Sequence, residues 1–188
     1  MEKEQPIAGG PIYLIGYMAA GKTTVGRLLA ERIGWHFVDL DDAFLQIHGY
    51  TPNEYIRKFG IDAFRKKEKY VLEDIADMSP YDNVVYATGG GYPCYEDNME
   101  CLVELGTSIY LRWTADDLAK RLMLTDLSER PVLQGRNEEE LKQFITPQLT
   151  AREEYYMQAD HVIDAPGFRE DADEILAEEI RELIERWE

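Results

Sequence analysis

A glycine-rich motif that follows an apolar segment and precedes a helical pattern is the strongest constraint on how this chain folds. The motif is Gly16-Tyr17-Met18-Ala19-Ala20-Gly21-Lys22-Thr23, which fits the phosphate-loop pattern G-x-x-x-x-G-K-[ST]. Residues 12–15 before it are apolar and predict a buried parallel strand. Behind it, apolar residues recur at helical spacing, at Val25, Leu28, Leu29 and Ile33. Strand, loop and helix therefore occur in the order that a phosphate loop requires.

Such a loop binds the phosphates of a nucleoside triphosphate. Its backbone N–H groups turn inward, and the helix behind it presents free N–H groups and the positive end of its dipole. Lys22 would reach the β and γ phosphates, and the Thr23 hydroxyl would bind magnesium. A glycine turn before an ordinary amphipathic helix is the alternative interpretation.

The composition predicts one globular domain, 1–188, without a membrane span. Of the 188 residues, 45% are hydrophobic and 30% are charged, and no apolar run approaches the roughly 18 residues that a membrane span needs. Residues 1–10 are polar and lack the apolar core of a signal peptide. We expect the two cysteines, Cys94 and Cys101, to be reduced. Cytoplasmic residence follows, with a monomer as the default oligomeric state.

The charge balance argues against a general nucleic-acid-binding protein. The formal net charge is −17, whereas nucleic-acid binding requires a basic face. Glu138-Glu139-Glu140 and residues 170–188 carry many of the acidic side chains, and both segments predict solvated helix faces. An anionic ligand in such a chain must be bound by local positive charges, so the positions of individual arginines are informative.

The order of elements predicts an α/β fold. Five strand-like segments occur, at residues 12–15, 36–38, 83–87, 108–111 and 161–163. Helical patterns separate them, with start signals at the capping box Thr51-Pro52-Asn53-Glu54 and at Thr114 with Asp117. A further long helix is expected to begin at Asp62. This alternation predicts a parallel sheet covered on both faces, with ligands at the carboxyl ends of its strands.

Two motifs come directly after predicted strands. Asp39-Leu40-Asp41-Asp42 follows the second strand, where a carboxylate can hold magnesium or its waters, or accept a hydrogen bond from a hydroxyl nucleophile. Helix capping by Asp41 or Asp42 is the alternative. Thr88-Gly89-Gly90-Gly91 follows the third strand, where many phosphate-loop ATPases carry an aspartate instead. Asp39 is therefore the better candidate for the outer shell of the metal, and the glycines permit close backbone approach to a ligand.

Three arginines are candidates for binding anionic groups. Arg65 is placed to face the pocket between the second and third strands, and Arg152 offers a second planar fork of donors. For either, a surface salt bridge is the common alternative. Arg130 lies in the polar segment 122–137, which is typical of a mobile lid that brings a cation onto the transferring phosphoryl group. A plain surface loop is the alternative for that segment.

Taken together, these segments resemble shikimate kinase from about Ile12 to Ile163. The signatures are the phosphate loop, Phe37-Val38-Asp39-Leu40-Asp41, the run at 88–91, and Arg130-Pro131-Val132-Leu133. The resemblance implies a P-loop kinase-like, three-layer α/β/α sandwich with a central five-stranded parallel sheet, acceptor-binding helices at about 41–80 and a mobile lid. It also implies transfer of phosphate from ATP to the 3-hydroxyl of shikimate, in the pathway to chorismate and aromatic amino acids.

The resemblance assigns a role to each candidate residue. The ATP-binding residues would be Ala19, Ala20, Gly21, Lys22, Thr23, Thr24, Arg130 and, on the adenine side, Arg121. The substrate-binding residues would be Asp41, Arg65, Gly89, Gly90, Gly91 and Arg152, with the two arginines binding the shikimate carboxylate. The residues holding Mg²⁺, directly or through water, would be Thr23 and Asp39. The catalytic residues would be Lys22, Asp41 and Arg130, with Asp41 drawing the proton from the attacking hydroxyl.

Two departures from the family pattern are visible. Ala19 stands where the family usually has a further glycine, which bears on the local loop geometry, and Val132 replaces a usual leucine. The tail beyond Gly167 has no motif that we interpret. A kinase for gluconate or a nucleoside monophosphate would share the loop, sheet and lid, but the paired arginines favour a hydroxylated carboxylic acid. A noncatalytic, kinase-like interaction module would have lost some of the site residues.

Overall fold

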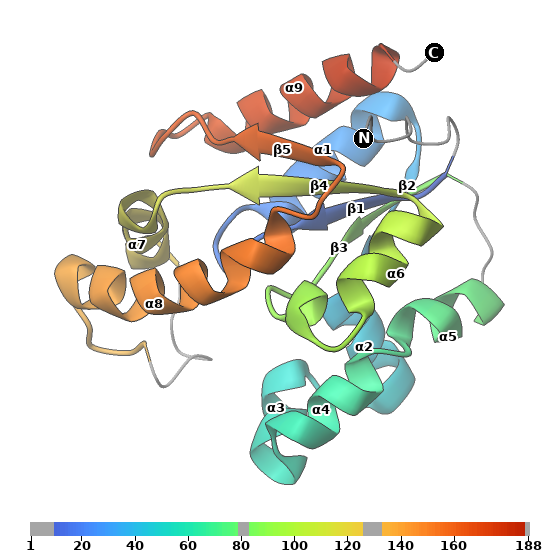
Figure 1. Ribbon diagram of the computed structural model, residues 1–188, viewed down its shortest axis with the longest axis horizontal. Coiled ribbons are helices and arrows are strands. Elements are labelled where there is room, and N and C mark those ends of the chain that lie inside the picture. The colour runs from blue at the N-terminus through green and yellow to red at the C-terminus, as the bar shows by residue number, and fades with distance from the viewer. Residues whose placement is uncertain (1–9, 79–82, 126–132, 187–188) are drawn as a thin grey trace.

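The protein folds around a five-stranded parallel sheet (Figure 1). The computed structural model describes residues 10–78, 83–125 and 133–186. The strand order across the sheet is β2-β3-β1-β4-β5. The strands are β1 (Ile12–Ile15), β2 (His36–Asp39), β3 (Val84–Ala87), β4 (Thr107–Arg112) and β5 (His161–Asp164).

The phosphate-loop strand lies in the middle of the sheet. Ile12 of β1 is paired with Val85 of β3 on one side and with Thr107 of β4 on the other. Every residue of β1 and β3 is buried, whereas the edge strands β2 and β5 keep partly exposed positions. This explains why the central strands are continuous apolar runs, since a parallel strand covered on both faces needs apolar side chains on both.

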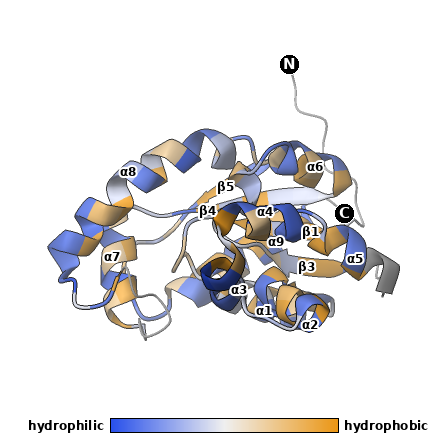
Figure 2. Ribbon diagram, turned by 90° about the horizontal axis from the view of Figure 1, so that it is seen from below, coloured by the Kyte–Doolittle hydropathy of each residue, from blue (hydrophilic) through white to orange (hydrophobic). Residues whose placement is uncertain are grey.

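Helices cover both faces of the sheet. They are α1 (Lys22–Ile33), α2 (Leu40–His48), α3 (Pro52–Phe59), α4 (Ile61–Glu68), α5 (Val71–Met78), α6 (Asn98–Leu105), α7 (Ala115–Met123), α8 (Glu138–Tyr156) and α9 (Ala172–Glu185), with a short 3₁₀ turn η1 (Tyr92–Cys94). Helices α1 and α9 pack against each other, and Figure 2 shows α6 and α8 on the side of the sheet opposite to α1. Helices α3 and α4 lie beside the sheet rather than over it (Figure 1). The expected three-layer α/β/α architecture is confirmed.

Local signals predicted several helix starts correctly. Thr51 forms the expected capping box with Glu54 at the start of α3, and the Thr114 side chain accepts from the Asp117 backbone N–H at the start of α7. The amphipathic acidic tail forms α9, whose buried residues include Leu176 and Ile180. Both cysteines are free, as expected. Among the described residues, no helix is both long enough and apolar enough to cross a bilayer.

The expectation of a long helix beginning at Asp62 is wrong. Helix α4 spans eight residues, and a turn at Lys69 and Tyr70 separates it from α5. The Lys69 carbonyl accepts a hydrogen bond from the Tyr92 hydroxyl. The Lys69 ammonium group forms ion pairs with Glu96 and Asp97. Tertiary contacts from the segment that follows β3 therefore end this helix. The spacing of apolar residues in the sequence does not indicate such contacts.

Candidate active site

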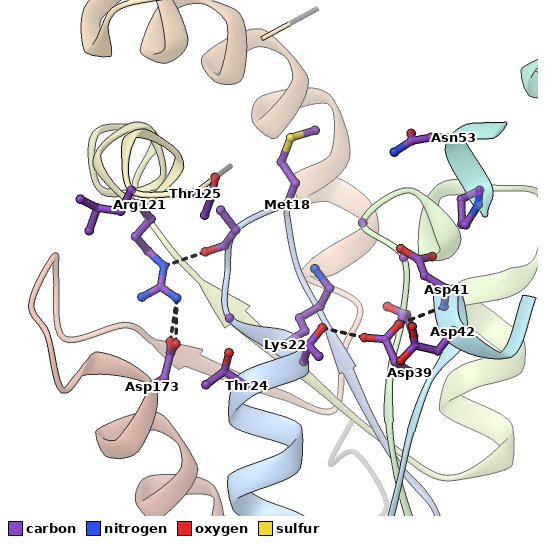
Figure 3. Close-up of a pocket in the computed structure, with 18 of the residues that line it drawn as sticks. Met18, Lys22, Thr24, Asp39, Asp41, Asp42, Asn53, Arg121, Thr125 and Asp173 are labelled. Carbon is purple, nitrogen blue, oxygen red and sulfur yellow. Dashed lines mark hydrogen bonds and ion pairs between the residues drawn. The ribbon is translucent and has the colours of Figure 1, made fainter. Parts of the chain in front are cut away.

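One large pocket opens where the predicted motifs come together. Its volume is about 1080 Å³, and it is lined by the phosphate loop, the aspartates after β2 and the glycines after β3. The lining also includes Leu45 of α2, residues 51–53 at the start of α3, Arg121 of α7 with the two residues that follow this helix, and residues 168–170 with Asp173 of α9. Figure 3 shows Asp39, Asp41 and Asp42 on one side, Arg121 and Asp173 on the other, and Lys22 between them. The pocket therefore lies at the carboxyl edge of the sheet, as the sequence predicted.

Lys22 is nearly buried at the first position of α1. Its ammonium group donates to the carbonyl oxygens of Gly16 and Tyr17, at 2.9 Å each. Gly21, which precedes it, has φ 86°, a left-handed conformation that glycine adopts without a Cβ penalty. The loop therefore wraps around the lysine and holds its charge at the head of the helix.

Thr23 and Asp39, the predicted magnesium residues, are in contact. The Thr23 hydroxyl donates to Asp39 Oδ2 at 2.6 Å, and Asp39 Oδ1 accepts from the Asp41 backbone N–H at 2.9 Å. Asp39 is thus the N-cap of α2, which corrects the alternative that Asp41 or Asp42 would cap it. Because Asp39 caps the helix, the Asp41 side chain is not used as the cap, and Asp41 lines the pocket.

The glycines after β3 touch three parts of the site. A Cβ placed on Gly89 would lie 3.4 Å from Asp41 Oδ1, and one on Gly90 would lie 3.3 Å from the Met18 nitrogen of the phosphate loop. A Cβ on Gly91 would lie 2.1 Å from Nη2 of Arg65, closer than any side chain can approach. Gly89 and Gly90 line the pocket, whereas Gly91 lies behind them against the arginine.

Arg65 forms an ion pair with Glu68, a residue that our sequence interpretation missed. Glu68 is only 3% exposed. Burial raises the pKa of its carboxyl group to about 7, although the Arg65 guanidinium opposes this rise; Asp41 adds to it. The i, i+3 spacing on one helix was the available signal, because it places both side chains on the same helix face.

Arg152 reaches the other side of the glycine segment. Its Nη1 lies 3.4 Å from the Gly90 carbonyl oxygen and its Nη2 lies 3.4 Å from Gln148 Oε1. Its guanidinium also lies over the Tyr17 ring, 5.1 Å from the centroid. Arg65 and Arg152 are thus both held next to the glycines, although neither is among the residues that line the described pocket.

On the opposite side of the pocket from Asp41, Arg121 connects three elements (Figure 3). Its Nε donates to the Ala19 carbonyl oxygen at 2.7 Å, and its Nη2 binds the Asp173 carboxylate of α9 at 2.8 and 3.0 Å. The guanidinium stacks on the Trp113 ring, 4.5 Å from the centroid. Ala19 has φ 62°, so the residue that departs from the family pattern keeps the left-handed conformation of a glycine. Asp173 was missed because nothing in the acidic tail marks it.

Part of the predicted lid falls outside the described residues. Arg130 and Val132 lie in that part, which the structure does not describe. On either side of it, α7 ends at Met123 and α8 begins at Glu138 with an Asn137 capping box.

Two comparisons with known proteins point to one family. The family model for shikimate kinase matches residues 18–185. The chain is 40% identical to a shikimate kinase of Parabacteroides distasonis over 162 residues, which cover 86% of this chain and 91% of that protein.

The chain belongs to the shikimate kinase family. ATP-dependent phosphorylation of shikimate is therefore the function expected of it. The crystal structure of shikimate kinase from Bacteroides thetaiotaomicron superposes with a TM-score of 0.83 at 34% identity, covering 94% of this chain and 98% of that one. Shikimate kinase from Acinetobacter baumannii, in complex with shikimate, gives a TM-score of 0.81 at 33% identity, covering 95% and 94%.

A more distant neighbour shows how widely the fold is shared. A gluconokinase from Sinorhizobium meliloti superposes with a TM-score of 0.53 at 16% identity. At that identity the likeness shows the fold alone, so the acceptor has to be argued from the site residues of this kinase.

Proposed function

We propose that this kinase transfers the γ-phosphoryl group of ATP to the 3-hydroxyl of shikimate through the residues assembled around the pocket. The carrying observation is that Lys22, Thr23 and Asp39 share one pocket with Asp41, while the glycines that border it contact Arg65 and Arg152. The phosphate loop and the two arginines thus all lie against the glycine segment 89–91. The bound shikimate of the A. baumannii relative supports this acceptor.

On the nucleotide side, residues 19–24 bind the triphosphate through backbone N–H groups and through the Lys22 ammonium. Two loop carbonyls hold that ammonium now, and the β and γ phosphates would replace them as partners because a charged acceptor forms the stronger hydrogen bond. Arg121 lies on the adenine side, at the far wall of the pocket from Asp41. Arg130 is proposed as the lid cation, within a lid at about 122–137.

Thr23 and Asp39 would hold Mg²⁺, because a hydroxyl and a carboxylate in contact offer the oxygen ligands that this ion prefers. Within the described residues, no group of three or more His, Cys, Asp or Glu side chains could hold a metal ion. This suits an ion that takes its remaining ligands from phosphate and water. When bound, Mg²⁺ supplies positive charge that neutralises the phosphate oxygens.

On the acceptor side, Asp41 would accept a hydrogen bond from the attacking hydroxyl and draw its proton. Arg65 and Arg152 would bind the shikimate carboxylate from two sides of the glycine segment 89–91. Helices within about 41–80 would form the acceptor-binding part of a single domain, 1–188. We further propose a cytoplasmic monomer whose partners are ATP and shikimate, with no nucleic-acid or membrane partner.

The test is ADP release from ATP and magnesium with shikimate, gluconate, nucleoside monophosphates or no acceptor. We expect strong stimulation by shikimate alone and a product heavier by one phosphoryl group in mass spectrometry. The Lys22→Met variant should fold and lose at least about 100-fold in turnover, as expected when a group that stabilises transferring charge is removed. Lys142→Met, at a partly exposed ion pair on α8, is the matched control and should keep full activity.

Other outcomes would reassign the site. Stimulation by gluconate or a nucleotide instead of shikimate would keep the kinase and discard the arginine clamp. ATP binding without turnover under every condition would favour an interaction module. Full activity of Lys22→Met would overturn the phosphate-loop assignment.

A further inference from the structure

Two side chains near the C-terminal end of α8 donate to one backbone oxygen. The Tyr156 hydroxyl donates a short hydrogen bond to the Gly90 carbonyl oxygen, and Arg152, one turn earlier, approaches the same oxygen at 3.4 Å. Gly90 lies directly against the phosphate loop, since a Cβ on it would be 3.3 Å from the Met18 nitrogen. This oxygen thus lies where the acceptor and nucleotide sides of the pocket meet.

The two donors differ in how firmly they hold that oxygen. Tyr156 is fully buried, and burial raises the pKa of its phenol, which therefore stays protonated and able to donate. The two Arg152 hydrogen bonds described above, to Gly90 and to Gln148, are both at 3.4 Å, beyond the usual N–H···O range of about 2.7–3.2 Å. Arg152 also hydrogen-bonds to the Tyr156 side chain and lies over the Tyr17 ring, but its bond to the Gly90 oxygen is long. Tyr156 is therefore the firmer partner of that oxygen.

We propose that Tyr156 is a positioning residue that satisfies the Gly90 carbonyl and so frees Arg152 to bind the acceptor carboxylate. The physical reason is that leaving a partly buried carbonyl without a hydrogen bond costs free energy. With Tyr156 in place, Arg152 can leave the Gly90 oxygen at little cost. Without the phenol, Arg152 becomes the remaining donor to this oxygen among the described residues. The acceptor carboxylate must then compete with the Gly90 carbonyl for Arg152.

The inference rests on the proposed acceptor role of Arg152 and predicts a selective defect. Tyr156→Phe should lower kcat/KM for shikimate roughly tenfold, because Arg152 must then leave a partly buried carbonyl without a hydrogen bond when it binds the acceptor. The KM for ATP should stay within about twofold, because the phosphate loop keeps its own contacts.

Tyr110→Phe is a matched control. Tyr110 is equally buried, and its ring centroid lies 5.0 Å from that of Tyr156. Its hydroxyl has no hydrogen-bond partner among the described residues. This variant should therefore leave both kinetic parameters unchanged, and its melting temperature calibrates the effect of removing a buried phenol.

A double-mutant cycle separates positioning from a general packing role. In an Arg152→Ala background, Tyr156→Phe should change kcat/KM for shikimate less than about twofold, because no arginine remains to be held. An undiminished tenfold loss in that background would overturn the proposal. Equal losses for ATP and shikimate in Tyr156→Phe alone would overturn it as well.

A measurement on the unaltered protein covers the case in which Tyr156→Phe does not fold. In a crystal structure with shikimate, the Tyr156 to Gly90 bond should persist while the Arg152 guanidinium moves from Gly90 to the carboxylate. Arg152 remaining on the Gly90 oxygen would contradict the proposal. If the unaltered protein did not turn over shikimate, the proposed function would have failed rather than this inference.

Discussion

At the scale of single residues, the proposed acceptor role of Arg65 depends on an ion pair with a buried carboxylate. Arg65 is held between Glu68 and the Cα of Gly91, so its guanidinium can occupy few orientations. A planar fork fixed in this way loses little entropy when it binds a carboxylate. The proposed acceptor role of Arg65 therefore extends to Glu68, although Glu68 does not line the described pocket.

Replacing Arg65 with alanine tests its part in acceptor binding. The variant loses a charge-assisted contact of roughly 1.5–3 kcal/mol, so shikimate affinity should fall by about 10- to 150-fold. Calorimetry with shikimate measures this directly. Lys66→Ala, an exposed position on the same helix, should leave the affinity unchanged. An unchanged affinity in Arg65→Ala would move the carboxylate site elsewhere.

Glu68 should make the free energy of unfolding depend on pH. Its pKa is about 7 in the folded protein against a reference value of 4.5. Between these pH values the folded state binds more protons than the unfolded state, so stability falls as pH rises through this window. Glu68→Gln has no such proton to lose. The unfolding free energy of the original protein relative to Glu68→Gln should fall by on the order of 3 kcal/mol between about pH 4.5 and pH 7.5.

Urea denaturation at a series of pH values measures this difference, and titrating groups that do not interact with Glu68 cancel in the comparison. Parallel curves for the two proteins would mean that Glu68 ionises at an ordinary pKa. A difference that grows with pH would mean that the Arg65 ion pair outweighs burial.

At the scale of elements, Arg121 of α7 links the phosphate loop to α9 through hydrogen bonds. The guanidinium holds the Ala19 carbonyl and the Asp173 carboxylate while Trp113 supports it from one face. The Trp113 indole also donates to the Ala20 carbonyl oxygen at 3.1 Å. The acidic tail thus contributes Asp173 to the wall of the pocket that we propose binds the nucleotide.

Arg121→Ala should weaken ATP binding without affecting shikimate. The variant frees the strained Ala19 segment and leaves the Asp173 carboxylate unpaired in a pocket for a triphosphate, so both effects act in the same direction. The KM for ATP should rise by about 10- to 100-fold. Arg121→Ala combined with Asp173→Ala should recover part of this loss, because the unpaired charge is then gone.

Steady-state kinetics with each substrate varied in turn decides this prediction. Lys120→Ala, the neighbouring position in α7 with a partly exposed side chain, is the control and should behave normally. A larger defect in the double variant than in Arg121→Ala would show that Asp173 assists ATP binding by itself.

The elements also show how far the sequence predicts this fold and where it stops. Strand cores and caps were predictable because they depend on neighbours in sequence, as at Thr51 and Thr114. The end of α4 was not, because residues some 27 positions later bind Lys69. Glu68 and Asp173 were missed for the same reason. Their importance comes from partners that the fold brings to them, such as Gly89 and Arg121.

At the scale of the whole molecule, the kinase is a strongly acidic body with a site for anionic substrates. Lysine and arginine number 20 against 37 acidic residues. Three of the positive charges described at the site are held by nearby groups, Lys22 by loop carbonyls and Arg65 and Arg121 by carboxylates. This arrangement keeps positively charged side chains near the pocket, although the acidic surface elsewhere repels anions. The acidic side chains of that surface also repel one another.

Self-repulsion should make thermal stability rise with salt at neutral pH. Increasing sodium chloride from about 0.01 M to about 0.1 M shortens the Debye length from roughly 30 Å to roughly 10 Å and screens the net charge. Each kcal/mol of relieved repulsion should raise Tm by about 2–4 °C in a chain of this size. At a pH near the isoelectric point of about 4.5, the net charge vanishes and the increase in Tm should vanish with it.

A control separates screening from chloride binding at the phosphate loop, which would also raise Tm. The Lys22→Met variant is scanned in parallel and should show the same increase in Tm. A Tm that falls with salt at neutral pH would mean that the surface ion pairs, such as Arg181 with Glu178, outweigh the repulsion of the whole.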